Sequence, residues 1–301
     1  MDMSTQQNSA QRGERPGCRC AKPCKNSGSC CYQSPIAYKM NSLGIVTISF
    51  NQARFFPECI ESVTVADPSR LRYVIVDPGS ADGSRDLIMK YKDRFSGMVL
   101  EPDQGPPDGL NRGFAVCDAD VYGYLNSDDR FRPGALDWVL DYFDGHPDTD
   151  VLLGAIAMID ENGKESRRKR TQDRPFDLRR YSINACNVFQ QGTFFRREAF
   201  LRTRGFNLAS KTAWDGELVV DMALAGARFD YTNKILGDFR IYPESITGSQ
   251  RLWQGYLQDR EHLRRKIYEA GIPSYSPLES RLVKMAHRFN PVRHLSYFLV
   301  S

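Results

Sequence analysis

A pair of adjacent carboxylates is the feature of this 301-residue chain with the clearest chemical potential. The segment YLNSDD places Asp128 and Asp129 side by side after an apolar run. Two carboxylates at a buried strand end repel each other and lose hydration, which is costly unless they share a cation. A hard divalent ion that also binds a diphosphate meets that need. The same acids could instead cap a helix, so the residues alone leave a metal pair and a cap pair open.

A second acidic segment, WDGEL, contains Asp215 and Glu217 and opens an amphipathic helix predicted over residues 212–226. Asp215 could act as the N-cap of a helix that starts near Gly216. The histidines are scattered and form no metal-binding pattern.

Strands and helices alternate through the first half of the chain and must position these acids. Short β-branched apolar runs predict the strands, and apolar residues at helical spacing predict the helices. The predicted strands are 44–50, 71–77, 97–101 and 120–125, and the predicted helices are 53–66, 84–95 and 108–117. Such alternation predicts an α/β fold with a mainly parallel central sheet and helices on both faces.

Polar or acidic residues follow each predicted strand, at 50–52, Asp77, 101–103 and 126–129. Ligands of parallel sheets bind outside the carboxyl ends of the strands, so these residues are expected to meet at one edge. No G-x-G-x-x-G motif follows the first strand, and no P-loop motif occurs. A dinucleotide site of the Rossmann type and a P-loop are therefore not expected.

The second half of the chain mixes strands with helices. The predicted strands are 151–160, 190–196, 229–231 and 235–242, and the predicted helices are 197–204, 212–226 and 251–270. The basic run 167–170 is expected on an exposed arm. Trp138 and Phe143 are expected in the core, as are the scattered cysteines Cys59, Cys117 and Cys186.

Both ends of the chain are net basic, whereas the middle is net acidic. Residues 1–41 are polar and hold five clustered cysteines, namely Cys18, Cys20, Cys24, Cys30 and Cys31. A disordered tail is expected there, with metal binding or disulfides as the alternatives. Residues 42–250 are expected to form the main domain, followed by an amphipathic helical appendage over 251–301.

No apolar run is long enough to span a membrane, and the N-terminus lacks the apolar core of a secretory signal. A cytoplasmic location is therefore expected. The C-terminal appendage interleaves basic and apolar residues, as do segments that lie in a membrane interface and segments that pack on their own domain or on a dimer partner. Peripheral contact at the inner face of the membrane is one expectation, no nucleic-acid partner is expected, and the oligomeric state stays open.

Eight motifs together resemble the family-2 glycosyltransferases that have the GT-A fold. They occur in the order and spacing of that family: FNQAR (50–54), YVIVDPGSADGS (73–84), EPDQGPPDGLNRGF (101–114), YLNSDD (124–129), MIDENG (158–163), QQGTFFRREAF (190–200), WDGEL (214–218) and FRIYPESITGS (239–249). The resemblance covers residues 42–250 and implies a single GT-A domain.

The resemblance assigns binding of the donor nucleotide to residues near the ends of the first four strands, namely Phe50, Asn51, Gln52, Asp77, Asp103, Asn111, Arg112 and Asn126. Asp77 would accept a hydrogen bond from the nucleotide base, in a pocket that residues 50–52 line and Asp103 adjoins. Asn111 and Arg112 would lie near the ribose or the diphosphate.

The resemblance also assigns the metal and the base. Asn126 and Asp128 match the first and last positions of the family's D-x-D motif, so Asp128 would ligate Mg²⁺ or Mn²⁺ with support from Asp129. Asp215 matches the acid that removes the acceptor proton, and Glu217 matches the second acid of that pattern. A base opposite the leaving group would invert the anomeric configuration.

The implied function is metal-dependent, inverting transfer of a sugar from a UDP- or dTDP-sugar to an acceptor hydroxyl, in polysaccharide or glycoconjugate biosynthesis. The acceptor would be a saccharide or a lipid-linked saccharide. A nucleotidyltransferase and a non-catalytic nucleotide-sugar-binding scaffold are the alternatives.

The sequence departs from the family pattern in three places. Pro78 replaces the usual Gly after the base-binding acid, Pro106-Pro107 stiffens the loop before Asp108, and Tyr242 replaces the His that completes the metal site in many relatives. Tyr242 is a poor neutral ligand, so water would fill that position or the metal would be held more weakly.

Overall fold

The computed structural model describes residues 42–169 and 175–289. The cysteine-rich segment predicted to be a disordered tail lies outside the described residues, and so do Arg170 and the last twelve residues, 290–301.

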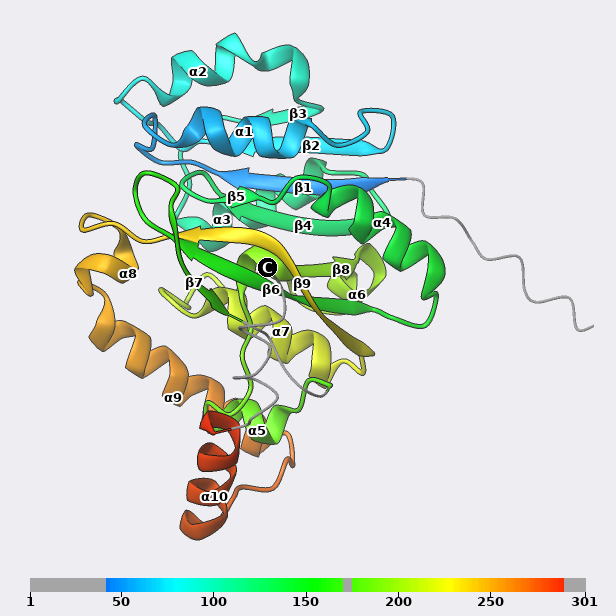
Figure 1. Ribbon diagram of the computed structural model, residues 1–301, viewed down its shortest axis with the longest axis vertical. Coiled ribbons are helices and arrows are strands. Elements are labelled where there is room, and N and C mark those ends of the chain that lie inside the picture. The colour runs from blue at the N-terminus through cyan, green and yellow to red at the C-terminus, as the bar shows by residue number, and fades with distance from the viewer. Residues whose placement is uncertain (1–41, 170–174, 290–301) are drawn as a thin grey trace, which may run out of the picture. The chain divides into compact units, whose positions relative to one another are not determined.

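A single mixed sheet forms the centre of the described chain (Figure 1). Its strands run in the order β3-β2-β1-β4-β8-β6-β9-β5, and β7 pairs with β6. The strands are β1 Leu43–Ile48, β2 Leu71–Val76, β3 Gly97–Val99, β4 Val121–Asn126, β5 Arg130–Phe131, β6 Val151–Ile159, β7 Glu165–Lys169, β8 Thr193–Arg196 and β9 Phe229–Arg240.

Helices cover both faces of this sheet. They are α1 Phe56–Thr64, α2 Ser84–Lys90, α3 Pro106–Val116, α4 Ala135–Gly145, α5 Leu178–Ser182, α6 Arg197–Leu201, α7 Trp214–Leu224, α8 Ile246–Ser249, α9 Trp253–Glu269 and α10 Pro277–Arg288, with the 3-10 turns η1 Lys92–Arg94 and η2 Gln190–Gly192. Side chains of α1, α2 and α4 share one core cluster, whereas those of α3, α6 and α7 share another.

Alternation along β1 shows why two faces are buried. Ile45 packs in the cluster with α1, and its neighbour Val46 packs in the cluster with α3. Successive side chains of a strand point to opposite faces, so a continuous apolar run gives a strand covered on both sides. Phe143, Cys59, Cys117 and Cys186 are buried, which confirms their predicted core positions.

The order of the first four strands positions the site. β1 pairs in parallel with β2 on one side and with β4 on the other. The chain therefore builds outward to β3 and returns past β1 to form β4, which is the arrangement that opens a crevice at the carboxyl ends of β1 and β4. The expected mainly parallel sheet is confirmed in this half, whereas pairs involving β8, β5 and β7 are antiparallel.

Some element boundaries differ from the prediction. The basic run expected on an exposed arm contributes Arg167, Arg168 and Lys169 to β7, which pairs with β6. The two strands predicted over 229–242 are one strand, β9. The strand predicted from residue 190 begins at Thr193, because 190–192 form the turn η2.

The helix α9 packs on its own domain. Leu263 and Ile267 are fully buried in a cluster with Tyr181 and Val220. Of the two options left by the sequence for the amphipathic segment 251–270, internal packing is therefore the one that α9 adopts. Figure 1 shows α9 and α10, in orange and red, at the end of the sheet away from β3.

Candidate active site

Two loops at the carboxyl edge of the sheet are fastened to each other. The Asn51 amide donates to Ser80 Oγ at 2.8 Å, and the Ala81 amide donates to Asn51 Oδ1 at 2.9 Å. The Ala53 amide donates to Asp82 Oδ2 at 2.8 Å. This cross-linking holds the loop after β1 against the loop after β2, with the Phe50 ring 60% exposed at the rim.

Asp77, at the end of β2, organises its own loop. Its carboxylate accepts hydrogen bonds from the Gly79 and Ser80 amides at 3.0 and 2.8 Å, from Ser80 Oγ at 2.6 Å and from Arg85 Nε at 3.1 Å. Burial acts against the charge, but these donors outweigh it and lower the pKa of Asp77. The residue expected to meet the nucleotide base is thus an ionised and fully buried anchor of the 77–85 loop.

Asp103, which the resemblance places next to the base pocket, lies close enough to Asp77 for the two charges to interact. The Gly105 amide donates to Asp103 Oδ1 at 2.8 Å. Burial raises the pKa of Asp103, and the charges of Asp108 and Asp77 act in the same direction. The Gly105 amide and the Arg112 charge oppose this only in part, so a ligand that brings donors or positive charge would favour the ionised form of Asp103.

Asn111 and Arg112 of α3 are held by the protein itself. Asn111 Nδ2 donates to the Phe206 carbonyl, and the Phe206 amide donates back to Asn111 Oδ1, both at 2.8 Å. Arg112 pairs with Asp108 at 2.7 Å and donates to the Pro102 carbonyl. The Asn111 side chain is a clamp on the 205–206 segment, whereas Arg112 is half-exposed beside the 101–105 loop.

The two acids after β4 have different surroundings. Asp129 is buried, and its carboxylate accepts from Gln191 Nε2 at 2.7 Å and from the Arg240 amide at 2.8 Å. Asp128 is half-buried and accepts from the Tyr242 hydroxyl at 3.1 Å. Burial raises the pKa of both carboxyls, and the Asp128 charge adds to the effect at Asp129. Asp128 is therefore the acid that can face a ligand, and Asp129 holds the loop.

Tyr242 and Gln52 complete this corner. Gln52 Nε2 lies 3.0 Å from the Tyr242 hydroxyl, which is itself bonded to Asp128. Burial and the Asp128 charge raise the pKa of Tyr242 to about 12. Tyr242 is therefore a neutral donor to Asp128, and it links the β1 loop to the β4 acids. Asn126 lies half-buried at the end of β4 in the same crevice.

The side chains of this corner suit a cation that takes most of its ligands from phosphate and water. In the parts of the chain that the structure describes, no group of three or more His, Cys, Asp or Glu residues is arranged to hold a metal ion. Mg²⁺ in phosphate sites takes one or two protein carboxylates and completes its shell with phosphate oxygens and water. Asp128, with its neutral partner Tyr242, offers such a single carboxylate.

Arg240 is a buried component of the site that the sequence analysis did not single out. Its side chain is 1% exposed, donates to the carbonyls of Asp128 and Asp160 at 2.8 and 3.1 Å, and pairs with Glu58. Its guanidinium also lies 4.7 Å from the centre of the Phe55 ring. The signal was present in the motif FRIYPESITGS, where an arginine stands inside an otherwise strand-like run.

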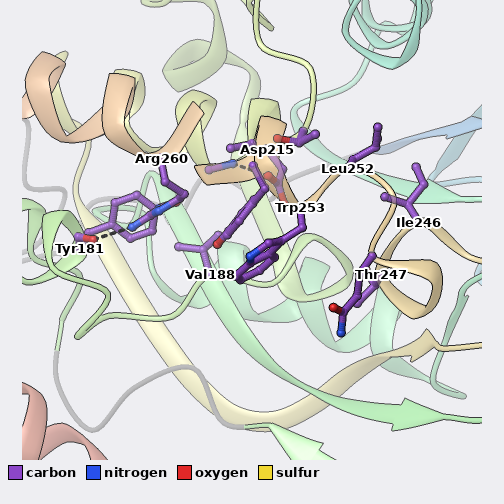
Figure 2. Close-up of a pocket in the computed structure, with 13 residues that line it drawn as sticks. Tyr181, Val188, Asp215, Ile246, Thr247, Leu252, Trp253 and Arg260 are labelled. Atoms are coloured by element: carbon purple, nitrogen blue, oxygen red, sulfur yellow. Dashed lines mark hydrogen bonds between the residues drawn. The ribbon is translucent and has the colours of Figure 1, made fainter. Parts of the chain in front are cut away.

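A cavity of about 590 Å³ lies beside the start of α7 (Figure 2). Asp215 lines it at the start of α7, together with Trp253, Tyr256 and Arg260 of α9 and Thr247 of α8. The rings of Trp253 and Tyr256 stack at 5.5 Å and are 52% and 36% exposed. The cavity thus combines one carboxylate with an open aromatic surface.

The environment of Asp215 suits a base. Burial raises its pKa, and the Gly216 amide, 2.7 Å from Oδ1, and the Arg260 charge only partly oppose this. The Asp215 charge also helps to raise the pKa of Tyr124, although burial is the larger cause there. Because Tyr124 lies on β4, Asp215 is close to the strand that ends in the acid pair.

Glu217 faces away from that cavity. It is 2% exposed and accepts from Lys266 Nζ at 2.9 Å and from Asn207 Nδ2 at 3.0 Å. The structure therefore places Glu217 in the contact between α7 and α9, and only Asp215 of the two predicted acids lines the cavity.

A family model described as glycosyl transferase family 2 matches residues 44–203, which is more than half of the chain. The chain belongs to this family. This glycosyltransferase is 26% identical to an uncharacterized glycosyltransferase of Nostoc sp. over 194 residues, which cover 61% of this chain and 60% of that protein. The match thus spans less than two thirds of that relative.

Solved structures share the fold of this glycosyltransferase. S. aureus TarS 1-349 in complex with UDP-GlcNAc superposes with a TM-score of 0.63 at 16% identity, covering 86% of this chain and 76% of that one. The mannosyltransferase PcManGT from Pyrobaculum calidifontis, in complex with GDP-Man and Mn²⁺, gives 0.55 at 17% identity, covering 78% and 69%. The predicted family and GT-A fold class are confirmed. Across residues 42–169 and 175–289, no helix has the length and apolarity needed to cross a bilayer.

Proposed function

We propose that this glycosyltransferase moves a sugar from a nucleoside diphosphate to an acceptor hydroxyl with inversion at the anomeric carbon. Asp215 is the base in this proposal, and the observation that carries it is the raised pKa of that carboxylate in a cavity large enough for an acceptor. A base with a raised pKa holds the acceptor proton more strongly once oxygen attacks the sugar.

Donor binding is proposed for the crevice at the ends of β1, β2 and β4. The nucleotide would lie against the fastened loops around Asn51 and Asp77, with Asp103 beside it. TarS and PcManGT, the neighbours in fold, are described in complex with a UDP-sugar and with a GDP-sugar and Mn²⁺. These complexes support a nucleotide sugar as donor, and we propose a UDP-sugar, with a dTDP-sugar as second choice.

A divalent cation, Mg²⁺ or Mn²⁺, is proposed at Asp128. When bound there it would neutralise charge that develops on the leaving diphosphate. Asp129 positions the loop by accepting from Gln191 and Arg240, and Tyr242 orients the Asp128 carboxylate through its hydroxyl.

The acceptor is proposed to be a saccharide, free or linked to a lipid, in polysaccharide or glycoconjugate assembly. Trp253 and Tyr256 offer an exposed aromatic face, and Thr247 and Gln250 offer hydrogen-bonding groups beside it. An apolar surface rimmed by a few polar groups is typical of a small-molecule site. A sugar presents both a C–H face and hydroxyls, so it matches both kinds of group.

The test combines donor release with two variants. We expect one nucleotide sugar from a panel to release its nucleotide with Mn²⁺ and not with EDTA. Asp215→Asn should bind that nucleotide as the wild type does and turn over about 10²–10⁴-fold more slowly. Asp128→Ala should lose the metal-dependent part of binding. Asp221→Asn, a carboxylate change elsewhere on α7, is the matched control and should keep wild-type turnover.

Other outcomes would favour the alternatives. Release of pyrophosphate from a nucleoside triphosphate would indicate a nucleotidyltransferase. Binding of a nucleotide sugar with no release, even in the presence of crude acceptor extract, would indicate a non-catalytic scaffold. In either case the role of Asp215 as base would be wrong.

A further inference from the structure

The helix α10 stands apart from the core while its start is fixed. None of its residues is buried. Ser276 and Glu279 form a capping box at its N-terminus, which satisfies backbone amides that a helix start leaves free. Arg179 of α5 donates to the Ser274 carbonyl at 2.9 Å and lies 3.8 Å from the centre of the Tyr275 ring. A well-capped helix is thus attached to the domain through its N-terminal end.

An apolar stripe runs along α10 on the side away from the protein. Leu278, Leu282, Met285 and Phe289 are 68%, 51%, 43% and 68% exposed. Their spacing of four, three and four residues places them on one helix face. The residues of the other side, Ser280, Val283 and His287, are only half-exposed, so this is the side turned toward the domain. A contiguous exposed apolar stripe of this kind marks an interaction surface.

Basic residues flank the stripe. Arg281, Lys284 and Arg288 are all exposed. The one acid of the helix, Glu279, accepts from the Ser276 amide and lies 3.7 Å from the Arg179 guanidinium. The sequence after the described part, 290–301, adds Arg293 and no acidic residue. The surface of α10 therefore presents positive charge together with apolar side chains.

We propose that α10 is a docking helix for an anionic membrane surface. Leu278, Leu282, Met285 and Phe289 would enter the boundary between headgroups and acyl chains, with the basic residues at the level of the lipid phosphates. A second copy of this chain is the less suitable partner. A two-fold contact through the same stripe would bring Arg281, Lys284 and Arg288 close to their own copies, and like charges repel.

The experiment is sedimentation of the full chain with phosphatidylcholine vesicles, with and without phosphatidylglycerol. We expect binding to the vesicles that contain phosphatidylglycerol, and weaker binding as salt is raised. Leu282→Glu/Met285→Glu and, separately, Arg281→Glu/Lys284→Glu should each weaken it by about tenfold or more. Met89→Glu/Leu201→Glu changes two exposed apolar residues on α2 and α6 and should bind as the wild type does.

The α10 variants are expected to fold as the wild type does, because α10 contributes no buried residue. Thermal unfolding of each variant checks this. Absence of binding by the wild type, or equal binding by all variants, would overturn the proposal. So would a concentration-dependent dimer in light scattering that the Leu282→Glu/Met285→Glu change disperses. Because the assay uses no substrate, its result is independent of the proposed glycosyl transfer.

Discussion

At the scale of single residues, the surroundings of Asp215 disfavour its charged form. Burial raises the pKa of Asp215 more than the Gly216 amide and the Arg260 charge lower it. A base must be ionised to act, so kcat/KM should fall as the pH drops through this raised pKa. We expect the acid limb of the profile to lie above the ordinary aspartate value of about 3.9.

Replacing Arg260 by Gln removes an opposing positive charge and should move that limb to still higher pH. The pH dependence of donor turnover at saturating acceptor, recorded for the wild type and for Arg260→Gln, measures the position of the limb in each protein. An acid limb that stays in place in Arg260→Gln would contradict the assignment of the limb to Asp215.

We expect a change at Glu217 to affect the stability of the protein, and not its turnover. Its buried carboxylate accepts from Lys266 and Asn207, so Glu217→Gln weakens the contact of α7 with α9. Lys266 keeps Asp221 as a partner, and we therefore expect a loss of about 1–3 kcal/mol in the free energy of unfolding. Chemical denaturation measures it. At denaturant concentrations too low to unfold the variant, we expect its turnover to be near the wild-type value. A loss of turnover without a loss of stability would instead indicate that Glu217 acts as a base.

Residue types alone indicated which acids to examine but not what each one contacts. The adjacency of Asp128 and Asp129 was visible in the sequence. Their different surroundings depend on Gln191 and Arg240, which lie more than sixty positions away in the chain and donate to the Asp129 carboxylate. Arg240 itself could not be placed, since a lone arginine in an apolar strand can equally be an edge residue. The roles in donor binding and catalysis remain predictions.

At the scale of elements, Gly216 shows how closely the first turn of α7 packs against α5. A Cβ at this position would collide with the Tyr181 hydroxyl, whereas a Cβ on Gly255 of α9 would lie 3.7 Å from Thr212 Cγ2, an ordinary contact. Gly216→Ala should therefore destabilise the protein by about 1–3 kcal/mol. Gly255→Ala should leave stability unchanged or raise it by up to about 1 kcal/mol, because Ala is the better helix former.

Thermal unfolding of the two variants compares them directly. A stabilised Gly216→Ala protein would show that Tyr181 moves aside freely and that this packing does not shape the cavity.

Elements with a strong local signal were predicted well, and those without one were missed. Strands β1, β2 and β4 are apolar runs bounded by turn residues, and their ends lie within about two residues of the prediction. The helix α3 begins at Pro106, earlier than expected, because proline is favoured in the first turn of a helix. By contrast, β7 has charged residues at four of its five positions, and only its pairing with β6 makes it a strand.

At the scale of the whole molecule, the boundary proposed after residue 250 can be tested by truncation. Removing 276–301 takes away α10, which buries nothing, and should change the melting temperature little. Removing 251–301 also takes away Leu263 and Ile267, which are fully buried against Tyr181 and Val220. Burial of two such side chains is worth roughly 3–6 kcal/mol, so this truncation should be strongly destabilised.

Calorimetry of both truncated chains decides the matter. If the shorter chain melts as the full chain does, then α9 is dispensable and the domain ends where the sequence suggested. The strand order β3-β2-β1-β4 was not predicted from the sequence, since alternation of strands and helices fixes neither the order nor the antiparallel additions.

The bond between the Asp129 carboxylate and the Arg240 amide has a consequence for biosynthesis. Asp129 is translated 111 residues before Arg240, so a nascent chain carries the acid pair through that stretch of synthesis without the amide that binds it. The crevice proposed to bind the donor should therefore mature only when β9 has left the ribosome exit tunnel. Ribosome-stalled chains that end before β9 should not be retained on immobilised UDP, whereas chains stalled after the complete sequence, with a linker in the tunnel, should be retained.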